Sequence, residues 1–423
     1  MLQISFIRQH TNEVKDRLAK RNFKDIALIQ KIIDLDDERK KVQAELEEIQ
    51  SNINNTSKDI GVLMTRGDKE LAGLKKNEIA LYKSQAAPLA DELSSTEHAL
   101  NDILVSIPNL PHHSVPAGKS AQDNELIKEG GSVPDLMTGA LPHWDLAKKY
   151  DLINFELGNK LTGSGFPVYK NKGAKLQRAL IQYFLDFNIA EGYVEYMPPL
   201  MINEASAYGT GQLPDKEGQM YHVVEDGLFL IPTAEVPVTN IYRDEILKES
   251  ELPIKMTAYT PCFRREAGSY GKDVRGLNRV HQFDKVEIIQ LTAPEKSYAV
   301  LEDMVSHVEK LLQSLQLPYR ILRLCGGDMS FTSAITYDFE VFSAAQQKWL
   351  EVSSVSNFET FQTNRMKIRF KDGGGKMQLV HSLNGSSLAL PRIVAALLEN
   401  NQVVDGIMIP VALQSYFGGD RIF

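Results

Sequence analysis

The sequence predicts an α+β protein in which an N-terminal antiparallel helical hairpin precedes a larger domain built on an antiparallel sheet flanked by helices. Three observations favour this fold class. Apolar residues in the first part of the chain repeat with heptad spacing. Strand-like and helix-like runs in the rest do not alternate regularly, which argues against a doubly wound parallel sheet. The chain of 423 residues, 43% hydrophobic and 24% charged, can also form a core in more than one domain.

The composition excludes several classes of protein. The formal net charge is −8, so any contact with nucleic acid must come from local basic patches. The two cysteines, Cys262 and Cys325, can form neither a disulfide framework nor a Cys-x-x-Cys zinc site, and they suit a reducing, cytoplasmic location. Gln3 and Arg8 interrupt the N-terminal segment, so we expect no signal peptide. No apolar run is long enough for a membrane span.

The N-terminal arm is predicted from two apolar seams. We expect helices on either side of a turn at Arg66-Gly67-Asp68, forming a hairpin over about residues 28–103 of a domain that spans 1–108. The first seam consists of Leu28, Ile32, Leu35, Val42, Leu46, Ile49, Ile53, Ile60 and Leu63. The second consists of Ile79, Tyr82, Ala86, Leu89, Leu93, Thr96, Leu100 and Ile103. Leu71, Leu74 and Leu81 follow a different phase, which leaves the register near the turn open.

The function of this arm has two interpretations. Heptads usually pair helices, so the residues alone favour a dimerisation coiled coil. The alternative is a probe for nucleic acid, because basic residues gather near the tip at Lys69, Lys75 and Lys76. Long cationic side chains on such a rod could follow a phosphate backbone.

The second domain, residues 109–423, is predicted to have a mixed α/β structure. A linker rich in proline and glycine precedes it. Strand-like runs cover 223–231, 286–291, 319–324 and 377–380, and helical runs cover 175–189, 294–315 and 388–400. The glycines at 373–375 predict a hairpin turn.

A group of charged and aromatic residues lies in two of these predicted strands. Strand alternation brings Arg264, Glu266 and Phe283 within reach of one face. A guanidinium beside an aromatic ring suits a phosphate and a stacked base. Taken alone, a pattern as short as this favours the alternative interpretation, a surface hairpin with salt bridges.

Two acidic residues elsewhere suggest ligand contacts. Glu235 lies among apolar residues and prolines and therefore needs a cation, either a substrate ammonium or a buried lysine or arginine. Glu351 and Ser354, three residues apart, could hold Mg²⁺ through oxygen, or they could simply belong to an edge strand.

The last long helix offers a third candidate. Ser386 and Ser387 are interpreted as its N-terminal cap. Arg392 in the first turns opposes the helix dipole, which an anion or a ring outside the helix would explain.

Together these segments resemble the class II aminoacyl-tRNA synthetases. The stretch FRREAG…HQFDKVE, within about 257–290, resembles motif 2, and NGSSLALPR, within about 383–400, resembles motif 3. The segment ending at Pro199, within about 173–199, resembles motif 1. The Thr-Ala-Glu triplet at 233–235, the GTGQLP segment and the helical arm resemble the bacterial type of seryl-tRNA synthetase. Ser387 and Pro391 depart from motif 3, which usually has glycines at these positions.

The resemblance implies a fold, two reactions and an assembly. It implies an antiparallel sheet of six or seven strands and a homodimer formed through motif 1, with Pro199 at the interface. Serine and ATP with Mg²⁺ would give seryl-adenylate and pyrophosphate. The seryl group would then pass to the 3′-hydroxyl of the terminal adenosine of tRNA(Ser), with tRNA(Sec) as a further candidate. We expect no zinc and no membrane partner. The arm would bind tRNA, which reverses the preference for dimerisation.

The resemblance also assigns roles to individual residues. Arg264, Glu287 and Arg392 are the catalytic candidates, with Arg264 between the α-phosphate and the serine carboxylate and the adenine between Phe283 and Arg392. The serine site would comprise Thr233, Ala234, Glu235, Arg264, Glu287 and Ser386. The ATP site would comprise Arg264, Arg265, Glu266, Phe283, Glu351, Val352, Ser353, Ser354 and Arg392, with Mg²⁺ on Glu351 and Ser354. Contacts with tRNA would come from Lys75, Lys76 and Arg275, the last within a loop over residues 268–278.

Two rival functions remain at this point. One is an amino acid:carrier-protein ligase, which shares the catalytic core but has no long arm. The other is a coiled-coil scaffold with a degenerate nucleotide fold, which need not keep Arg264, Glu266, Glu351 and Arg392 together. The short segment after Arg392 leaves no room for the anticodon-binding domain of the prolyl, threonyl and histidyl enzymes, so we expect tRNA to be recognised by the arm.

Overall fold

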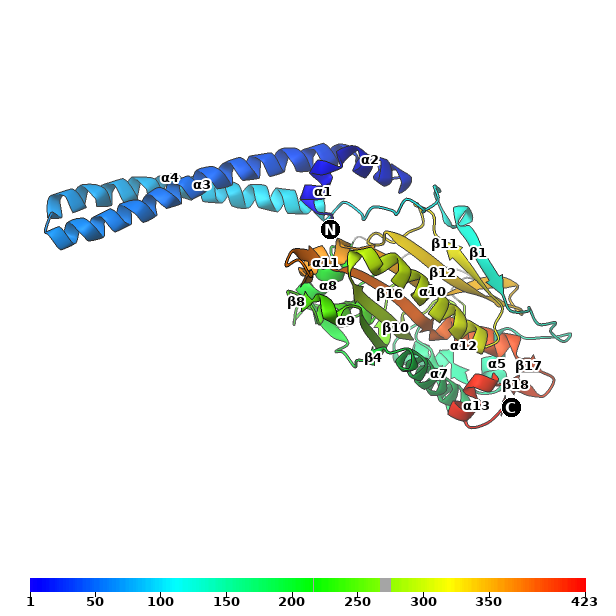
Figure 1. The fold of residues 1–423 in the computed structure, drawn as a ribbon. Helices are drawn as coiled ribbons and strands as arrows, with labels where there is room; N and C mark the ends of the chain where they lie inside the picture. The colour runs from blue at the N-terminus through cyan, green and yellow to red at the C-terminus, as the bar shows by residue number, and fades with distance from the viewer. Residues whose placement is uncertain (216, 267–274) are drawn as a thin grey trace. The chain divides into compact units, whose positions relative to one another are not determined.

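The computed structural model describes residues 1–215, 217–266 and 275–423 (Figure 1). They form two compact units, one of residues 1–19 and 23–108 and the other of residues 20–22 and 109–423. Each unit is described by itself.

The first unit is the predicted helical hairpin with two short helices before it. These are α1 (Ile4–Gln9) and α2 (Thr11–Lys20), and the hairpin consists of α3 (Ala27–Arg66) and α4 (Lys69–Leu104), which run side by side (Figure 1). Gly67, at φ 85°, ends α3, and its N–H donates to the carbonyls of Leu63 and Met64. A left-handed residue at this position favours glycine, which explains the sharp turn at the predicted place.

The buried seam of the hairpin follows most of the predicted heptads and departs from them at a few positions. Ile32, Val42, Leu46, Thr56, Thr96 and Leu100 are all buried, whereas Leu71, Leu74 and Leu81 of the second phase are exposed. In place of Leu35, the interior takes the carboxylate of Asp36. Arg8, Arg39 and Lys40 pair with it at 3.2, 2.9 and 2.7 Å. Burial acts to raise the pKa of Asp36, but the hydrogen bonds from Lys40 and Arg39 lower it overall.

The second unit contains an eight-stranded sheet, in the order β1-β11-β12-β13-β16-β10-β9-β4. Its strands are β1 (Glu125–Gly130), β4 (Val194–Glu195), β9 (Ile254–Phe263), β10 (Gln282–Thr292), β11 (Tyr319–Arg323), β12 (Ile335–Ser343), β13 (Lys348–Glu359) and β16 (His381–Ala389). Neighbouring strands are antiparallel except β4 and β9, which are parallel. The predicted fold class is confirmed. The sheet has eight strands in the described part of the chain, whereas six or seven were expected.

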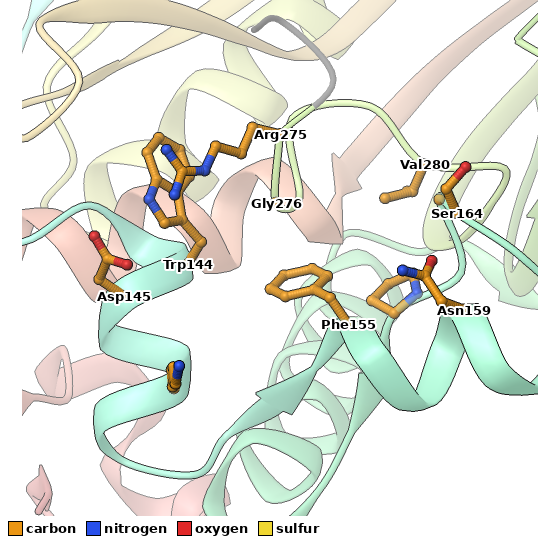
Figure 2. A pocket seen from close by; sticks show the side chains of 11 residues that line it. Trp144, Asp145, Phe155, Asn159, Ser164, Arg275, Gly276 and Val280 are labelled. Atoms are coloured by element: carbon orange, nitrogen blue, oxygen red, sulfur yellow. The ribbon is translucent and has the colours of Figure 1, made fainter. Parts of the chain in front are cut away.

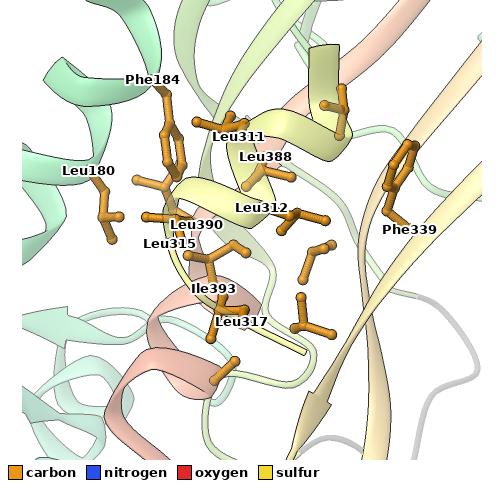
Figure 3. Packing of buried hydrophobic residues seen from close by; sticks show 14 of the residues in the cluster. Leu180, Phe184, Leu311, Leu312, Leu315, Leu317, Phe339, Leu388, Leu390 and Ile393 are labelled. Atoms are coloured by element: carbon orange, nitrogen blue, oxygen red, sulfur yellow. The ribbon is translucent and has the colours of Figure 1, made fainter. Parts of the chain in front are cut away.

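Three helices bury one face of this sheet. They are α7 (Asn171–Ala190), α10 (Ser297–Ser314) and α12 (Leu390–Asn400). Figure 3 shows their side chains meeting those of the strands, with Phe184 from α7, Leu312 from α10, Ile393 from α12 and Phe339 from β12. This apolar cluster is the main core, and burial of such side chains is the chief source of stability.

Smaller elements surround the sheet. The remaining helices are α5 (His143–Lys149), α6 (Phe155–Leu161), α8 (Glu204–Thr210), α9 (Glu235–Asn240), α11 (Phe361–Met366) and α13 (Val411–Phe417). The remaining strands are β2 (Ile153–Asn154), β3 (Val168–Tyr169), β5 (Met201–Asn203), β6 (His222–Val223), β7 (Leu228–Leu230), β8 (Ile246–Lys248), β14 (Arg369–Lys371), β15 (Met377–Leu379), β17 (Gln402–Val403), β18 (Gly406–Met408) and β19 (Arg421–Ile422). Strands β14 and β15 form the hairpin predicted at the three glycines. None of the helices described is long and apolar enough to cross a membrane.

Two local predictions are wrong. The run 223–231 is not one strand but the hairpin of β6 and β7, because Gly227 takes φ 63° and turns the chain. Ser386 and Ser387 do not cap the last helix, because they lie inside β16, and α12 begins only at Leu390. Pro391 suits the start of that helix, since its missing N–H would have no partner there.

Candidate active site

The site is built around Glu287, whose side chain lies on the face of the sheet opposite the main core. Successive side chains of a strand point to opposite faces, so Val286 and Ile288 join the core while Glu287 turns away. Glu287 is only 1% exposed and stands in register with Ser386 of β16. The strand position of Ser386, which replaces the predicted cap, thus brings it directly beside Glu287.

The two carboxylate oxygens of Glu287 have different surroundings. Its Oε1 accepts hydrogen bonds from Thr233 Oγ1 at 3.0 Å and from Ser386 Oγ at 3.3 Å, and it pairs with the ammonium of Lys285. Its Oε2 is buried and has no hydrogen-bond partner within the described residues. A buried oxygen without a donor is costly, so a ligand that donates a hydrogen bond would be favoured here.

A second buried carboxylate, Glu235, lies at the start of α9. Its Oε1 accepts from Gln362 Nε2 at 2.6 Å, and its N–H donates to Thr233 Oγ1 at 3.2 Å. Thr233 therefore links both acidic residues. Burial raises the pKa of Glu235 to about 7. In the described part of the chain, no lysine or arginine forms an ion pair with Glu235, so the protein-cation alternative is not what the structure contains.

Arg264 directly follows the last residue of strand β9, and Phe283 is the second residue of strand β10. The guanidinium of Arg264 lies 5.3 Å from the centre of the Phe283 ring, and its Nε donates to the carbonyl of Pro232 at 3.3 Å. Strand β9 ends at Phe263, so Arg264 and Glu266 belong to the connecting segment, not to a strand as predicted. The structure nevertheless places a guanidinium beside an aromatic face, as the sequence pattern suggested.

The next two residues of this segment are held by their backbone. The N–H groups of Arg265 and Glu266 donate to the carbonyl and to the side-chain oxygen of Gln219, at 2.9 and 3.1 Å. The carboxylate of Glu266 pairs with Arg279. Sequence reasoning did not single out Gln219 or Arg279, because neither belongs to a short pattern with its partner.

Arg392, in the first turn of α12, is held by two backbone carbonyls. Its Nε donates to Asn278 at 3.0 Å and its NH1 to Glu351 at 2.7 Å. The carboxylate of Glu351 is 3.8 Å from the same guanidinium and half exposed. This arrangement leaves a planar cation at the edge of the site, supported by the connection between β9 and β10 and by strand β13.

Oxygen groups gather beside Glu351. Ser354 is in register with Asp338 of β12 and forms a hydrogen bond with it, and Asp338 Oδ1 has no partner among the described residues. Burial and the charge of Glu351 raise the pKa of Asp338 well above its usual value. The side chains of Val352 and Ser353 are buried, and Ser353 Oγ donates to the carbonyl of Ser386 at 2.6 Å, so these two residues can face a ligand only through their backbone.

Such oxygen donors suit Mg²⁺. The described residues hold no cluster of three or more His, Cys, Asp or Glu placed to bind a metal by themselves, so a cation here would need oxygen ligands from a bound nucleotide as well.

A cavity of about 400 Å³ lies beside Arg275 (Figure 2). Its lining includes Trp144, Lys148, Phe155 and Asn159, and the guanidinium of Arg275 lies 4.5 Å over the Trp144 ring. Residues 268–274 of the predicted tRNA-binding loop lie outside the described residues.

The remaining predicted residues are two lysines of the first unit and Pro199 of the second. Lys75, on α4, pairs with Glu78 at 2.7 Å, and Lys76 beside it is exposed. Pro199 is exposed in the segment between β4 and β5, next to Met197 and Leu200.

An antiparallel sheet whose strands carry Glu287 and Glu351, with Arg264 in the segment that follows β9 and Arg392 on the helix that follows β16, defines a class II aminoacyl-tRNA synthetase. The family model of the "tRNA synthetase class II core domain (G, H, P, S and T)" matches residues 221–401, and that of the "Seryl-tRNA synthetase N-terminal domain" matches residues 1–111. The chain belongs to the seryl-tRNA synthetase family.

Individual relatives agree over the full length. The serine–tRNA ligases of Salinibacter ruber and Chlorobaculum parvum are both 47% identical to this chain, whose whole length they match, and the matches cover 99% and 100% of those proteins. The crystal structure of seryl-tRNA synthetase from Pyrococcus horikoshii complexed with ATP has a TM-score of 0.90 and 32% identity, covering 100% of this chain and 99% of that one. The serine–tRNA ligase from Naegleria fowleri in complex with AMP has a TM-score of 0.86 and 26% identity, covering 100% and 98%.

Proposed function

We propose that this chain is a serine–tRNA ligase that activates L-serine with ATP and then transfers the seryl group to tRNA(Ser). The observation that carries the substrate assignment is the pair of buried carboxylates, Glu235 and Glu287, joined by Thr233. Lys285 neutralises one of them, and the ammonium of serine would neutralise the other. The unpaired Oε2 of Glu287 would accept a hydrogen bond from the substrate.

The first step is the attack of the serine carboxylate on the α-phosphate of ATP. The oxygen–phosphorus bond to serine forms as the bond to pyrophosphate breaks, and no protein group needs to form a covalent bond. Arg264 stands beside Phe283 and would hold the two anions together. Charge neutralisation and positioning would supply most of the acceleration.

The nucleotide site uses the residues around Arg264. The adenine ring would lie between Phe283 and Arg392, with Glu266 near its amino group and the backbone of Arg265, Val352 and Ser353 along the rim. Glu351 and Ser354 would hold Mg²⁺, which neutralises phosphate charge when bound. Asp338, which sequence reasoning missed, lies next to both Glu351 and Ser354.

The second step is transfer of the seryl group to the 3′-hydroxyl of tRNA. We propose that the first unit, with Lys75 and Lys76 on its arm, binds tRNA, and that Arg275 contacts the acceptor end. The same residues could serve tRNA(Sec). The two buried free cysteines suit the reducing cytoplasm, where we place the reaction.

We further propose a homodimer formed through β4 and the segment that follows it. Val194, Met197 and Met201 are 58%, 90% and 49% exposed around Pro199, and β4 is the last strand of the sheet. An exposed apolar edge of this kind favours association with a second copy.

The decisive experiment measures pyrophosphate exchange with each amino acid, and then transfer of the activated amino acid to tRNA and to a carrier protein. We expect exchange with serine alone and transfer to tRNA(Ser). Exchange without transfer to tRNA would favour the carrier-protein ligase, and no exchange at all would favour the scaffold.

A further inference from the structure

A buried polar network surrounds Glu399, which lies two turns beyond Arg392 on α12. Both Glu399 and His143 of α5 are 0% exposed at the side chain. The carboxylate of Glu399 accepts from His143 Nδ1 at 2.7 Å, from the His143 N–H at 2.9 Å, from Gln346 Nε2 at 2.8 Å and from Ser343 Oγ. Burial acts to raise the pKa of Glu399, but the hydrogen bonds from His143 and Ser343 lower it overall.

The network sets the protonation of His143. Its Nδ1 faces the carboxylate and must donate, while its Nε2 receives the backbone N–H of Leu277 at 2.9 Å and must accept. The imidazole is therefore neutral, with its proton on Nδ1. A second proton on Nε2 would break the contact with Leu277.

Residues 275–278 form a tight turn that this network supports. The side chain of Asn278 donates to Gln346 Oε1 at 2.9 Å, and its N–H donates to the carbonyl of Arg275 at 3.4 Å. Gly276 has φ +67°, and a Cβ there would lie 2.2 Å from His143 Nε2. Glycine is thus required both for the conformation and for the close approach of the imidazole.

The turn is linked to two guanidinium groups, its own Arg275 and Arg392 of α12. The carbonyl of Asn278 accepts from Arg392 Nε at 3.0 Å. Arg275 begins the turn and lies over Trp144, as Figure 2 shows. One short segment therefore contacts the residue proposed to stack on adenine and contains the residue proposed to contact tRNA.

We infer that His143 and Gln346, both held by Glu399, are positioning residues that fix the turn 275–278 and, through it, Arg392 and Arg275. This inference rests on the proposed function, since it takes the roles of both arginines from there. Catalytic groups must be held within about 0.5 Å of their working positions. A turn without regular secondary structure needs such support from buried side chains.

The test replaces His143 with Phe, which keeps a ring in the cavity but removes both nitrogens. With the imidazole gone, we expect the KM for ATP in pyrophosphate exchange to rise about fivefold to tenfold, as for the loss of one hydrogen bond. The KM for serine should stay within twofold. The KM for tRNA should also rise, because Arg275 loses its support. Backbone amide exchange at Leu277 should become faster, which reports on the turn without any catalysis.

Matched variants separate this inference from other effects. His307→Phe removes another buried histidine, which bonds Asn188 outside the network, and should leave the KM for ATP within twofold. Active-site titration in every case counts the folded enzyme, so a purely structural loss would lower the active fraction without changing KM. If His143→Phe does not fold, Gln346→Leu removes the side-chain contacts of Gln346 with Glu399 and with Asn278 and should also raise the KM for ATP.

The inference and the proposed function fail differently. If Arg392→Ala leaves the KM for ATP unchanged, the proposed role of Arg392 is wrong. If Arg392→Ala raises that KM while His143→Phe and Gln346→Leu change neither it nor amide exchange at Leu277, the network has no positioning role and the inference is overturned.

Discussion

At the scale of single residues, Arg264 offers the sharpest test of the adenylation step. Its Nε is bound to Pro232, so the two terminal nitrogens remain to face two anions at once. Arg264→Lys keeps the charge but loses this planar fork. We expect adenylate formation to fall at least about 100-fold, close to 3 kcal/mol, while ATP binding changes much less. Single-turnover kinetics and equilibrium ATP binding measure the two effects. Near-normal turnover would make Arg264 a structural residue.

Selection of serine over alanine is the second residue-scale prediction. Ser386 donates to Glu287, whose other oxygen has no hydrogen-bond partner among the described residues, so these two residues are placed to bond the serine hydroxyl. Ser386→Ala should reduce serine activation and narrow the preference for serine over alanine. Glu235→Gln should weaken both amino acids about equally, because both carry an ammonium. The kcat/KM values for serine, threonine and alanine in pyrophosphate exchange decide this. An unchanged serine-to-alanine ratio in Ser386→Ala would place recognition of the hydroxyl elsewhere.

Glu235 also predicts how stability depends on pH. Its pKa is raised from 4.5 to about 7, so the folded protein retains a proton that the unfolded chain releases. This carboxyl therefore makes the protein less stable as pH rises from about 4.5 to 7. The glutamine side chain of the Glu235→Gln variant carries no charge at any pH, so this variant does not lose stability in this way. Without ligands, its free energy of unfolding relative to the parent should increase by about 2 kcal/mol between pH 5.5 and 8.5.

Urea titrations at constant protein concentration measure this difference, and a fixed concentration also keeps any dimer equilibrium comparable. Glu245→Gln, which changes an exposed carboxyl, is the control. A difference that does not change with pH would mean that Glu235 is ionised in the folded protein throughout this range.

At the scale of helices and strands, the sequence predicted correctly those elements whose positions depend on a local pattern of residues. The hairpin seam follows heptads, and a heptad needs only neighbours along the chain, so α3 and α4 end within a few residues of the expected positions. The prediction of a single strand over 223–231 was wrong because the apolar residues at its two ends belong to two strands, which pair with each other on either side of the turn at Gly227. The prediction that Ser386 and Ser387 cap the last helix was wrong. A pair of serines before a helix is typical of a cap, but here strand β16 ends at Ala389 and α12 begins at the next residue, so both serines belong to the strand.

The partners of the site residues could not be predicted in this way. Glu235 and Gln362 are 127 positions apart, and Asn278 meets Arg392 across 114. Such pairs arise from the order of strands in the sheet, and no periodicity along the chain reveals them. Asp338 was missed for the same reason, because strand register brings Ser354 beside it. Lys285 lies two residues before Glu287 on the same strand, a local spacing that the sequence reasoning overlooked.

The edge strand β4 gives the prediction that belongs to this scale. Met197→Asp places a charge on a side chain that is 90% exposed, beside the apolar edge proposed to be the dimer interface. We expect the protein to become largely monomeric, because a buried charge without a partner is strongly unfavourable at an interface. Val404→Asp changes an equally exposed side chain, at 82%, and should leave the oligomeric state unchanged. Sedimentation velocity distinguishes the two. A Met197→Asp dimer as stable as the parent would locate the interface elsewhere.

At the scale of the whole molecule, the division into two compact units predicts a division of labour. The site contacts from Thr233 to Arg392 are all made within the second unit, and the hairpin has its own buried seam. Deleting residues 28–103 and joining the ends with a short flexible linker should therefore leave serine-dependent pyrophosphate exchange nearly intact. Transfer to tRNA should fall by orders of magnitude, because the cationic surface of the arm is lost.

A milder change to the arm separates tRNA binding from any effect of the deletion on folding. The double variant Lys75→Ala, Lys76→Ala leaves the helix intact and should weaken tRNA binding. The slope of the logarithm of the binding constant against the logarithm of salt concentration should become shallower by up to about two units. Lys75 is paired with Glu78, so Lys76→Ala alone should account for the larger share. Lys31→Ala and Lys41→Ala, exposed on the other helix away from the tip, provide the matched pair. If exchange collapsed in the deletion while its circular dichroism stayed that of a folded protein, or if the tip pair bound tRNA with an unchanged salt slope, the arm would have a different role.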